Sequence, residues 1–215
     1  MNHITHHLTD EVLMAYSAGS LPEAFELVVA AHVSMCDECR ARLDAFDAIG
    51  GAVIESGETA ALAEGSLDAT MALISAAPEF DAPRVAANSA VFPAPLQEYV
   101  GGDLSAVKWR SIGGGVRQAV LSRTKKASVR LIAIPGGVQM PDHGHRGMEM
   151  TMVLKGAFRD EHDRFGRGDV EIANEDMHHT PVAEDGEECI CLAATDAPLR
   201  FNAFIPRIAQ PFLRI

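Results

Sequence analysis

Residues 135–156 read PGGVQMPDHGHRGMEMTMVLKG and carry the most regular pattern of polar residues in the chain. The pattern is a glycine, five residues, a His-x-His pair, three residues, a glutamate, six residues and a second glycine. In an extended chain alternate side chains point to the same side, so His143 and His145 face the same way. After a turn at Arg146-Gly147, Glu149 begins an apolar run that can pair with the first. Two imidazoles and a carboxylate then converge as three ligands of a metal site.

This spacing resembles the first motif of the cupin family, Gly-x5-His-x-His-x3,4-Glu-x6-Gly, and every position is met from Gly137 to Gly156. The resemblance implies an all-β barrel that holds a metal ion through His143, His145 and Glu149. The other interpretation is that His-x-His is a pair of surface residues on an edge strand. It does not account for the glycines at both ends or for the register of the glutamate.

The resemblance places the fourth ligand in the second cupin motif, Gly-x5-Pro-x-Gly-x2-His-x3-Asn. Counted from Gly168, this motif selects His179, whereas counting from one residue earlier selects His178 but begins on an arginine. The sequence departs from the motif at Asn174, Asp176 and Ala183, which stand where proline, glycine and asparagine are expected. The expected ligands are His143, His145, Glu149 and His179. Three histidines and a carboxylate accept zinc or another divalent transition metal, such as iron, manganese or nickel.

The first 77 residues have helical periodicity instead. Thr9 or Asp10 can cap a first helix, and Ser20-Leu21-Pro22-Glu23 has the form of a capping box for a second. A third helix follows Cys39, and we expect it to stop at Gly50-Gly51. Ser66 can cap a fourth helix that ends before Pro78. Four short helices bury too little apolar surface to be robust without a further link.

A second group of metal-ligating residues supplies such a link. His32, three residues, Cys36, two residues and Cys39 place an imidazole one helical turn before a Cys-x-x-Cys turn. Thiolate and imidazole ligands suit tetrahedral zinc, and His7 is the candidate fourth ligand, with His6 and His3 as alternatives. Cys-x-x-Cys is also found in redox pairs of the thioredoxin type, but no βαβ pattern surrounds this one. We expect structural zinc bound by His7, His32, Cys36 and Cys39.

After residue 77 the periodicity changes. Residues 78–95 hold four prolines and read as a linker. Beyond them, eight short apolar runs between 107 and 204 are separated by glycines, prolines and charged turns, a pattern typical of a sandwich or barrel. The sequence therefore predicts an α + β multidomain chain: a small helical zinc-binding bundle at 1–77, a linker at 78–95 and an all-β cupin barrel at 96–215.

Composition limits where the protein works. The chain has 215 residues, of which 47% are hydrophobic, without a run of about 20 apolar residues that could span a bilayer. Residues 1–12, MNHITHHLTDEV, have neither the basic region nor the apolar core of a secretory signal. Four cysteines in two close pairs then favour metal or thiol chemistry over disulfides. We expect a cytoplasmic protein without a membrane partner.

The net charge of −12 is concentrated at the N-terminus. Residues 1–80 contain thirteen acidic and two basic residues, a balance of −11, whereas residues 81–215 have a balance of −1. Such a negative region repels nucleic acid and attracts basic protein surfaces, although an acidic domain can also be merely soluble.

His-x3-Cys-x2-Cys in a small acidic helical region, followed by a cupin motif, resembles the ChrR-type zinc-binding anti-sigma factors over nearly the whole chain. The resemblance implies a partner, an extracytoplasmic-function (ECF) sigma factor, and a zinc-bearing cupin that receives a stress signal such as singlet oxygen. It also implies that the fourth helix contacts the sigma factor, through Leu67, Met71 and Ile74. The alternative is that this apolar stripe packs on its own bundle.

Two other functions remain possible at this point. A metal-dependent cupin enzyme of the dioxygenase type, with a helical oligomerisation domain, would use the same cupin ligands for turnover. A zinc-dependent DNA-binding repressor is disfavoured by the acidic N-terminal region. Cys189 and Cys191 alternate in a strand, and so are either buried apolar residues or a redox-responsive pair that is poorly placed for a mutual disulfide. We expect a regulator without catalytic residues.

Overall fold

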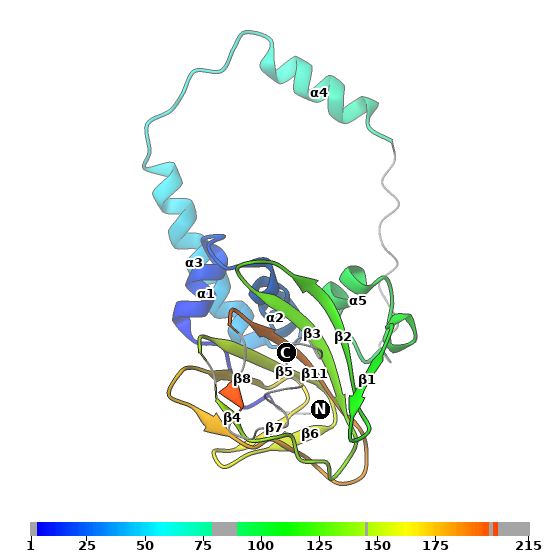
Figure 1. Cartoon of the computed structure of the whole chain (residues 1–215). Helices are drawn as coiled ribbons and strands as arrows, with labels where there is room; N and C mark the ends of the chain where they lie inside the picture. The colour runs from blue at the N-terminus through cyan, green and yellow to red at the C-terminus, as the bar shows by residue number, and fades with distance from the viewer. Residues whose placement is uncertain (1–3, 79–89, 145, 198–199, 202–215) are drawn as a thin grey trace.

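The structure is a computed structural model that describes residues 4–78, 90–144, 146–197 and 200–201. Helices come first and strands follow (Figure 1), which confirms the expected α + β order. The helices are α1 (Asp10–Ser17), α2 (Glu23–Val33), α3 (Asp37–Glu55), α4 (Ser66–Ala76) and α5 (Ala94–Val100), followed by a 3-10 turn at Leu104–Ala106. The strands are β1 (Arg110–Gly113), β2 (Val116–Arg123), β3 (Ser128–Ile134), β4 (His143–Gly144), β5 (Glu149–Lys155), β6 (Ala157–Arg159), β7 (Arg164–Gly166), β8 (Val170–Ala173), β9 (His178–His179), β10 (Val182–Ala183), β11 (Cys189–Thr195) and β12 (Arg200–Phe201).

The strands form one large antiparallel sheet and two small ones. The large sheet has the order β1-β2-β3-β11-β5-β8, and the small sheets have the orders β10-β6-β7 and β12-β4-β9. Strand β11 lies between β3 and β5, with Leu192 opposite Leu131 on one side and Met152 on the other. The small sheets complete the barrel and carry two of the expected histidines, His143 on β4 and His179 on β9.

Helix α2 packs against the outer face of this sheet, where it contacts β11, β5 and β3. Its apolar residues are buried around its circumference, among them Phe25, Val28 and Val29. A helix that is apolar all round is a buried helix, and here the sheet covers one side while α1 and α3 contact it from the bundle. One hydrophobic cluster therefore runs from the helices to the outer face of the sheet, including Met152 and Leu192.

Because strand side chains alternate, the same strands line the barrel interior with their other residues. A second hydrophobic cluster fills part of this interior with Val116, Ile134, Val153, Phe158 and Phe165. Burial on both faces explains why β11 is almost continuously apolar, rather than alternating as in a sheet with one face in water.

Three expectations about helix ends were wrong. The N-cap of α4 is Gly65, and Ser66 is the first residue of the helix rather than its cap. Helix α3 does not stop at Gly50-Gly51 but continues to Glu55, because glycine weakens an exposed helix without blocking it. The capping box at Ser20 does not form: α2 has Pro22 at its N-cap without a side-chain cap, and Ser20 Oγ donates to Ala15 O. In contrast, Thr9 caps α1 by accepting a hydrogen bond from Val12 N.

Other expectations fall partly outside the described residues. The proposed linker includes residues 79–89, and the proposed strand at 201–204 extends past β12. Helix α5 begins at Ala94, within the segment expected to be a linker, and packs on α2. Within the part of the chain that the structure describes, no helix is both long and apolar enough to cross a bilayer.

Candidate metal centres

The first centre lies where the N-terminal segment meets the junction of α2 and α3. His7 precedes α1, His32 is in the last turn of α2, Cys36 is the N-cap of α3 and Cys39 is in its first turn. One ligand atom from each of these four residues lies within 4.8 Å of the others. The structure thus brings together the four residues expected to bind zinc.

The distances within this group suit a tetrahedral zinc site. His7 Nδ1 lies 3.3 Å from Cys36 Sγ and 3.7 Å from Cys39 Sγ. Two ligands bound to one zinc ion at about 2.0–2.3 Å in tetrahedral geometry are separated by similar distances. His7 Nε2 lies 3.4 Å from a carboxylate oxygen of Glu38, which leaves Nδ1 as the atom directed at the thiols.

His32 provides the clearest indication that this group of residues fits a metal ion. Its Nδ1 donates to the carbonyl oxygen of Gly168 at 2.9 Å, so Nε2 carries the lone pair. That buried Nε2 atom has no hydrogen-bond partner among the described residues. Burial lowers the pKa of His32 to about 4, which keeps the imidazole neutral and able to bind a metal. The residues present therefore fit a zinc ion.

His6, the alternative to His7, has a different environment. Its Nε2 lies 3.1 Å from Asp163 Oδ2, and its backbone N–H donates to Asp169 Oδ1 at 2.9 Å. The backbone N–H of Thr5 donates to the same oxygen at 2.7 Å. These bonds attach the N-terminal segment to the turn before β8 and leave His7 as the histidine that reaches the cysteines. His3 lies outside the described residues.

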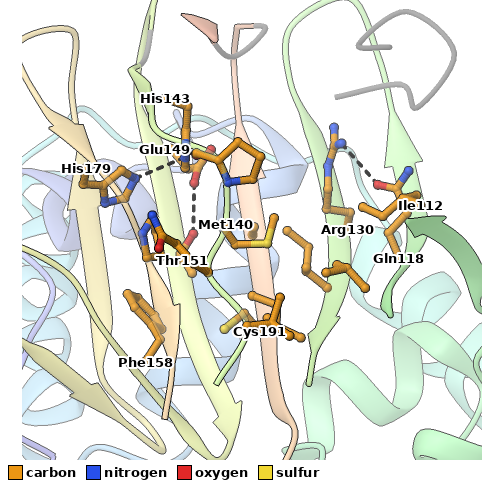
Figure 2. A pocket seen from close by; sticks show the side chains of 18 of the residues that line it. Ile112, Gln118, Arg130, Met140, His143, Glu149, Thr151, Phe158, His179 and Cys191 are labelled. Atoms are coloured by element: carbon orange, nitrogen blue, oxygen red, sulfur yellow. Dashed lines mark hydrogen bonds between the residues drawn. The ribbon is translucent and has the colours of Figure 1, made fainter. Parts of the chain in front are cut away.

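The second centre lies inside the barrel (Figure 2). His143 Nδ1 donates to the Pro141 carbonyl oxygen at 2.8 Å, and His179 Nδ1 lies 2.9 Å from Glu171 Oε1. Both Nε2 atoms consequently carry lone pairs, yet they face one another at 3.2 Å. Two imidazole nitrogens at that distance share a cation, either a proton in a hydrogen bond or a metal ion, and two imidazoles bound to one metal at about 2.1 Å have this separation. The pair therefore fits a metal ion as well.

The other two expected ligands are Glu149 and His145. Glu149 lines the same cavity as His143 and His179, and its Oε1 accepts a hydrogen bond from Thr151 Oγ1 at 3.2 Å. His145 lies outside the described residues. Three of the four expected cupin ligands are thus brought to one cavity, from β4, β5 and β9.

Two carboxylates contact His179 at Nδ1, the ring nitrogen that does not face His143. The cupin motifs predict neither of them. Asp160 Oδ2 lies 3.1 Å from His179 Nδ1, on the same side as Glu171. Burial disfavours a charged His179, but hydrogen bonds to Glu171 and Asp160 outweigh it and raise the pKa to about 9. Burial also raises the pKa of Glu171 to about 7. Glu171 could have been predicted from the sequence, because the alternation of side chains along β8 directs it into the barrel. No sequence pattern marks Asp160.

Cys189 and Cys191 are buried free thiols inside the barrel, with their sulfurs 3.6 Å apart. A hydrogen bond to Cys189, together with burial, raises the pKa of the Cys191 thiol well above its ordinary value. Protonated thiols are weak nucleophiles, so both cysteines pack as small apolar side chains in the inner hydrophobic cluster, and Cys191 lines the cavity wall.

Comparisons with known proteins give the class of the C-terminal part first. Residues 97–198 match the family model of the ChrR cupin-like domain. Over 212 residues, 99% of each chain, the sequence is 58% identical to the anti-sigma-E factor ChrR of Cereibacter sphaeroides. A chain in the crystal structure of Rhodobacter sphaeroides SigE in complex with the anti-sigma ChrR aligns with a TM-score of 0.77 and 56% identity, covering 90% of this chain and all of that one. The protein belongs to the ChrR family of anti-sigma factors, which are regulators rather than enzymes.

Proposed function

We propose that this protein binds an ECF sigma factor through its helical N-terminal region and thereby keeps the sigma factor inactive. The relative at 56% identity forms a complex with SigE, a sigma factor, and the alignment covers 90% of this chain. The observation that carries the proposal is an exposed apolar surface on helices of the strongly acidic region.

Helix α4 forms part of that surface. It has no buried residue, and Figure 1 shows it standing apart from the folded body of the molecule. Its four large apolar side chains are 53–73% exposed; they are Leu67, Met71, Leu73 and Ile74. The alternative that the stripe packs on its own bundle is therefore not what the structure has. Exposed apolar side chains grouped on one element are typical of a protein interaction site.

The second half of α3 also carries exposed apolar side chains. Ile49, Val53 and Ile54 are also largely exposed, between 62% and 81%. We use the term apolar docking surface for these three residues together with the four of α4, although the two helices lie apart in Figure 1. The surrounding region, residues 1–80, has a charge of −11, which complements the basic surfaces through which a sigma factor binds DNA.

The first centre gives this region its rigidity. We propose that His7, His32, Cys36 and Cys39 bind zinc, with His32 Nε2 and His7 Nδ1 as the nitrogen ligands. Bound zinc supplies a structural crosslink between the N-terminal segment and the junction of two helices. Burial raises the pKa of the Cys39 thiol to about 11, so this site binds zinc only with loss of a thiol proton.

The cupin region, in this proposal, is the sensor. His143, His145, Glu149 and His179 bind zinc or another divalent metal, and a stress signal, oxidative in nature, ends the inhibition. A signal can act only if it changes the relative free energies of the sigma-bound and free states. A structural change in the barrel can reach the helical region through the contact of α2 with the sheet, since the two regions share one hydrophobic cluster.

The proposal includes the organisation and location of the chain. We place the sigma-binding region at 1–77, a connecting segment at 78–95 and the cupin at 96–215, although helix α5 spans the end of that connecting segment and packs on α2 of the helical region. A partner that binds RNA polymerase, together with free thiols at two sites, favours a cytoplasmic location.

The test is binding of the full-length protein to its sigma factor, measured by biolayer interferometry. Leu67→Glu places a charge on the apolar docking surface and is expected to weaken binding at least tenfold, because a burying partner would desolvate that charge. Ser75→Glu makes the same charge change at another exposed position of α4 and is the matched control. Binding that is equally unaffected by both substitutions would contradict the proposed surface, and failure of the unsubstituted protein to bind would contradict the proposed function.

A further inference from the structure

One short stretch of chain, residues 168–171, contacts both metal centres. The Gly168 carbonyl oxygen accepts a hydrogen bond from His32 Nδ1 at 2.9 Å, at the first centre. Three residues later, Glu171 Oε1 lies 2.9 Å from Nδ1 of His179, at the cupin centre inside the barrel. An extended chain advances about 3.3 Å per residue, so these two contacts lie at most roughly 10 Å apart along the backbone. The two centres are therefore joined through three residues of one strand and the turn before it.

The turn at Gly168 is closely packed against the helical region. Its φ of +95° is a conformation that favours glycine, and a Cβ added there would lie 2.7 Å from the Ile4 side chain. The next residue, Asp169, accepts backbone hydrogen bonds from residues 5–6 with its buried carboxylate, at 2.7 and 2.9 Å. Movement of this turn therefore moves the segment that carries His7, because close-packed groups leave no space to absorb the movement.

A row of aromatic rings makes a second connection. Phe158 lines the barrel cavity on the same side as His179 (Figure 2), and it stacks on Phe165 with ring centroids 5.0 Å apart and planes inclined by 24°. The Phe165 ring lies 4.4 Å from the His6 ring, centroid to centroid. His6 directly precedes His7 in the chain. Three packed rings thus lead from the cavity of the cupin centre to the neighbour of a first-centre ligand.

From these contacts we propose that residues 165–171 couple the two centres, so that the first centre holds zinc more firmly when the cupin centre is filled. The His179 ring, once it holds a metal ion, is fixed in orientation, and so are the Glu171 carboxylate and the start of β8. With the cupin centre empty, these groups are less restricted, and the acceptors just before β8 must be ordered when zinc binds the first centre. The conformational entropy lost in filling one centre thus lowers the cost of filling the other.

This inference deepens the regulation proposed above and rests on both metal sites proposed there. It gives a signal at the cupin centre a route to the sigma-binding region that does not pass through α2. Loss of metal from the cupin centre would loosen zinc in the first centre. The crosslink between the N-terminal segment and the α2–α3 junction would loosen with it.

The experiment follows the first centre alone, in the full-length protein loaded with cobalt(II). Cobalt(II) accepts the same imidazole and thiolate ligands as zinc, and its bonds to thiolate give a charge-transfer band in the near ultraviolet. Among the proposed ligands of the two centres only Cys36 and Cys39 supply thiolates, so this band reports on the first centre. Iodoacetamide alkylates these thiols when the centre opens, and the decay of the band then gives the opening rate.

His143→Ala removes a ligand from the cupin centre and is expected to speed this decay at least about fivefold. His162→Ala is the matched control and should leave the decay unchanged, because His162 is exposed and its backbone N–H, which alanine retains, donates to Asp160 Oδ1. In Asp169→Ala, which frees the N-terminal segment from β8, adding His143→Ala should speed the decay less than about twofold. General destabilisation of the barrel would instead speed the decay alike in both backgrounds.

The reciprocal measurement uses Cys39→Ser, which removes a ligand from the first centre. Because a coupling free energy acts equally in both directions, the affinity of the cupin centre for zinc should fall at least about fivefold, measured by competition with a chromophoric chelator. This second measurement decides if His143→Ala does not fold. Unchanged cupin affinity in Cys39→Ser, or equal decay of the band in His143→Ala and the unsubstituted protein, would overturn the coupling. An acceleration that persists undiminished in Asp169→Ala would overturn the route through residues 165–171.

Failure of the coupling can be told apart from failure of the proposed function. Absence of the charge-transfer band in the unsubstituted protein would contradict the first metal centre and the coupling together. A band whose decay is independent of the cupin centre would contradict the coupling alone. Binding of the sigma factor is measured separately, so the proposed inhibition would stand.

Discussion

At the scale of single residues, the histidine ligands of the two centres are oriented by hydrogen bonds at the ring nitrogen that does not bind the metal. His32 Nε2 is free for a cation because Nδ1 donates to the Gly168 carbonyl, and His179 presents Nε2 because Nδ1 faces Glu171. In both cases an oxygen acceptor fixes the tautomer and the orientation of the ring before a metal arrives. Such outer partners commonly change metal affinity by about 10–100-fold when removed.

Glu171→Gln tests this arrangement without removing a ligand. The glutamine retains the size of the side chain, but it lacks the negative charge that orients and strengthens His179. We expect the cupin centre to lose about tenfold or more in zinc affinity, measured by competition with a chromophoric chelator. Glu187→Gln, which removes an exposed carboxylate that pairs only with Lys155 among the described ion pairs, is the control. Unchanged affinity in Glu171→Gln would show that Glu171 does not support the ligand.

At the scale of elements, the start of β8 is attached to the N-terminal segment. The Asp169 carboxylate accepts backbone hydrogen bonds from Thr5, His6 and Gly166, and the His6 carbonyl oxygen accepts one from Val170 N at 3.3 Å. These bonds lie immediately before His7 in the chain. The barrel therefore holds the segment that delivers one zinc ligand, in addition to the carbonyl that orients His32.

Asp169→Ala is accordingly expected to weaken the first centre although Asp169 binds no metal. Loss of the two backbone hydrogen bonds from Thr5 and His6 to the buried carboxylate loosens residues 5–7, so the conformational entropy cost of ordering His7 is paid when zinc binds. Zinc should leave the first centre at least about tenfold faster, followed with a zinc-sensitive dye. Asp163→Ala, which removes an exposed carboxylate beside the His6 ring, should change the rate little. Equal rates in both variants would show that the attachment is not needed.

At the scale of the whole molecule, the helical region and the barrel share one hydrophobic cluster. Helix α2 covers the outer face of the large sheet, and Val28 on α2 is fully buried, as are Met152 and Leu192 on the sheet. Separating the two regions would expose these side chains to water, at roughly 1.5–3 kcal/mol for each large apolar one. The two regions are thus expected to unfold together.

The single tryptophan makes this testable. Trp109 precedes β1 and reports on the barrel, whereas circular dichroism at 222 nm reports mainly on the helices. Both signals should change at one midpoint. Val28→Ala should lower the free energy of unfolding by about 2 kcal/mol and shift both midpoints equally, because it leaves a cavity between helix and sheet. A helical transition at lower temperature than the tryptophan transition would show two independent units.

The sequence by itself determined the parts that depend on short spacings. His-x3-Cys-x2-Cys and the first cupin motif each occupy a short segment, so helix and strand geometry bring these ligands near one another without knowledge of the rest of the fold. The change from helical to strand periodicity likewise gave the two regions and their order. Helix ends were less predictable. Helix α3 continues through two glycines, because glycine lowers the stability of a helix without preventing its continuation.

Only the tertiary structure decided which surfaces meet. The bond from His32 to Gly168 joins residues 136 positions apart, and no periodicity specifies such a contact. The same holds for Asp160 behind His179 and for α2 on the sheet. Local patterns show which side of an element is apolar. The packing of the whole chain selects the element that covers that side, because the hydrophobic effect depends on the apolar area buried and not on the direction or identity of the partner.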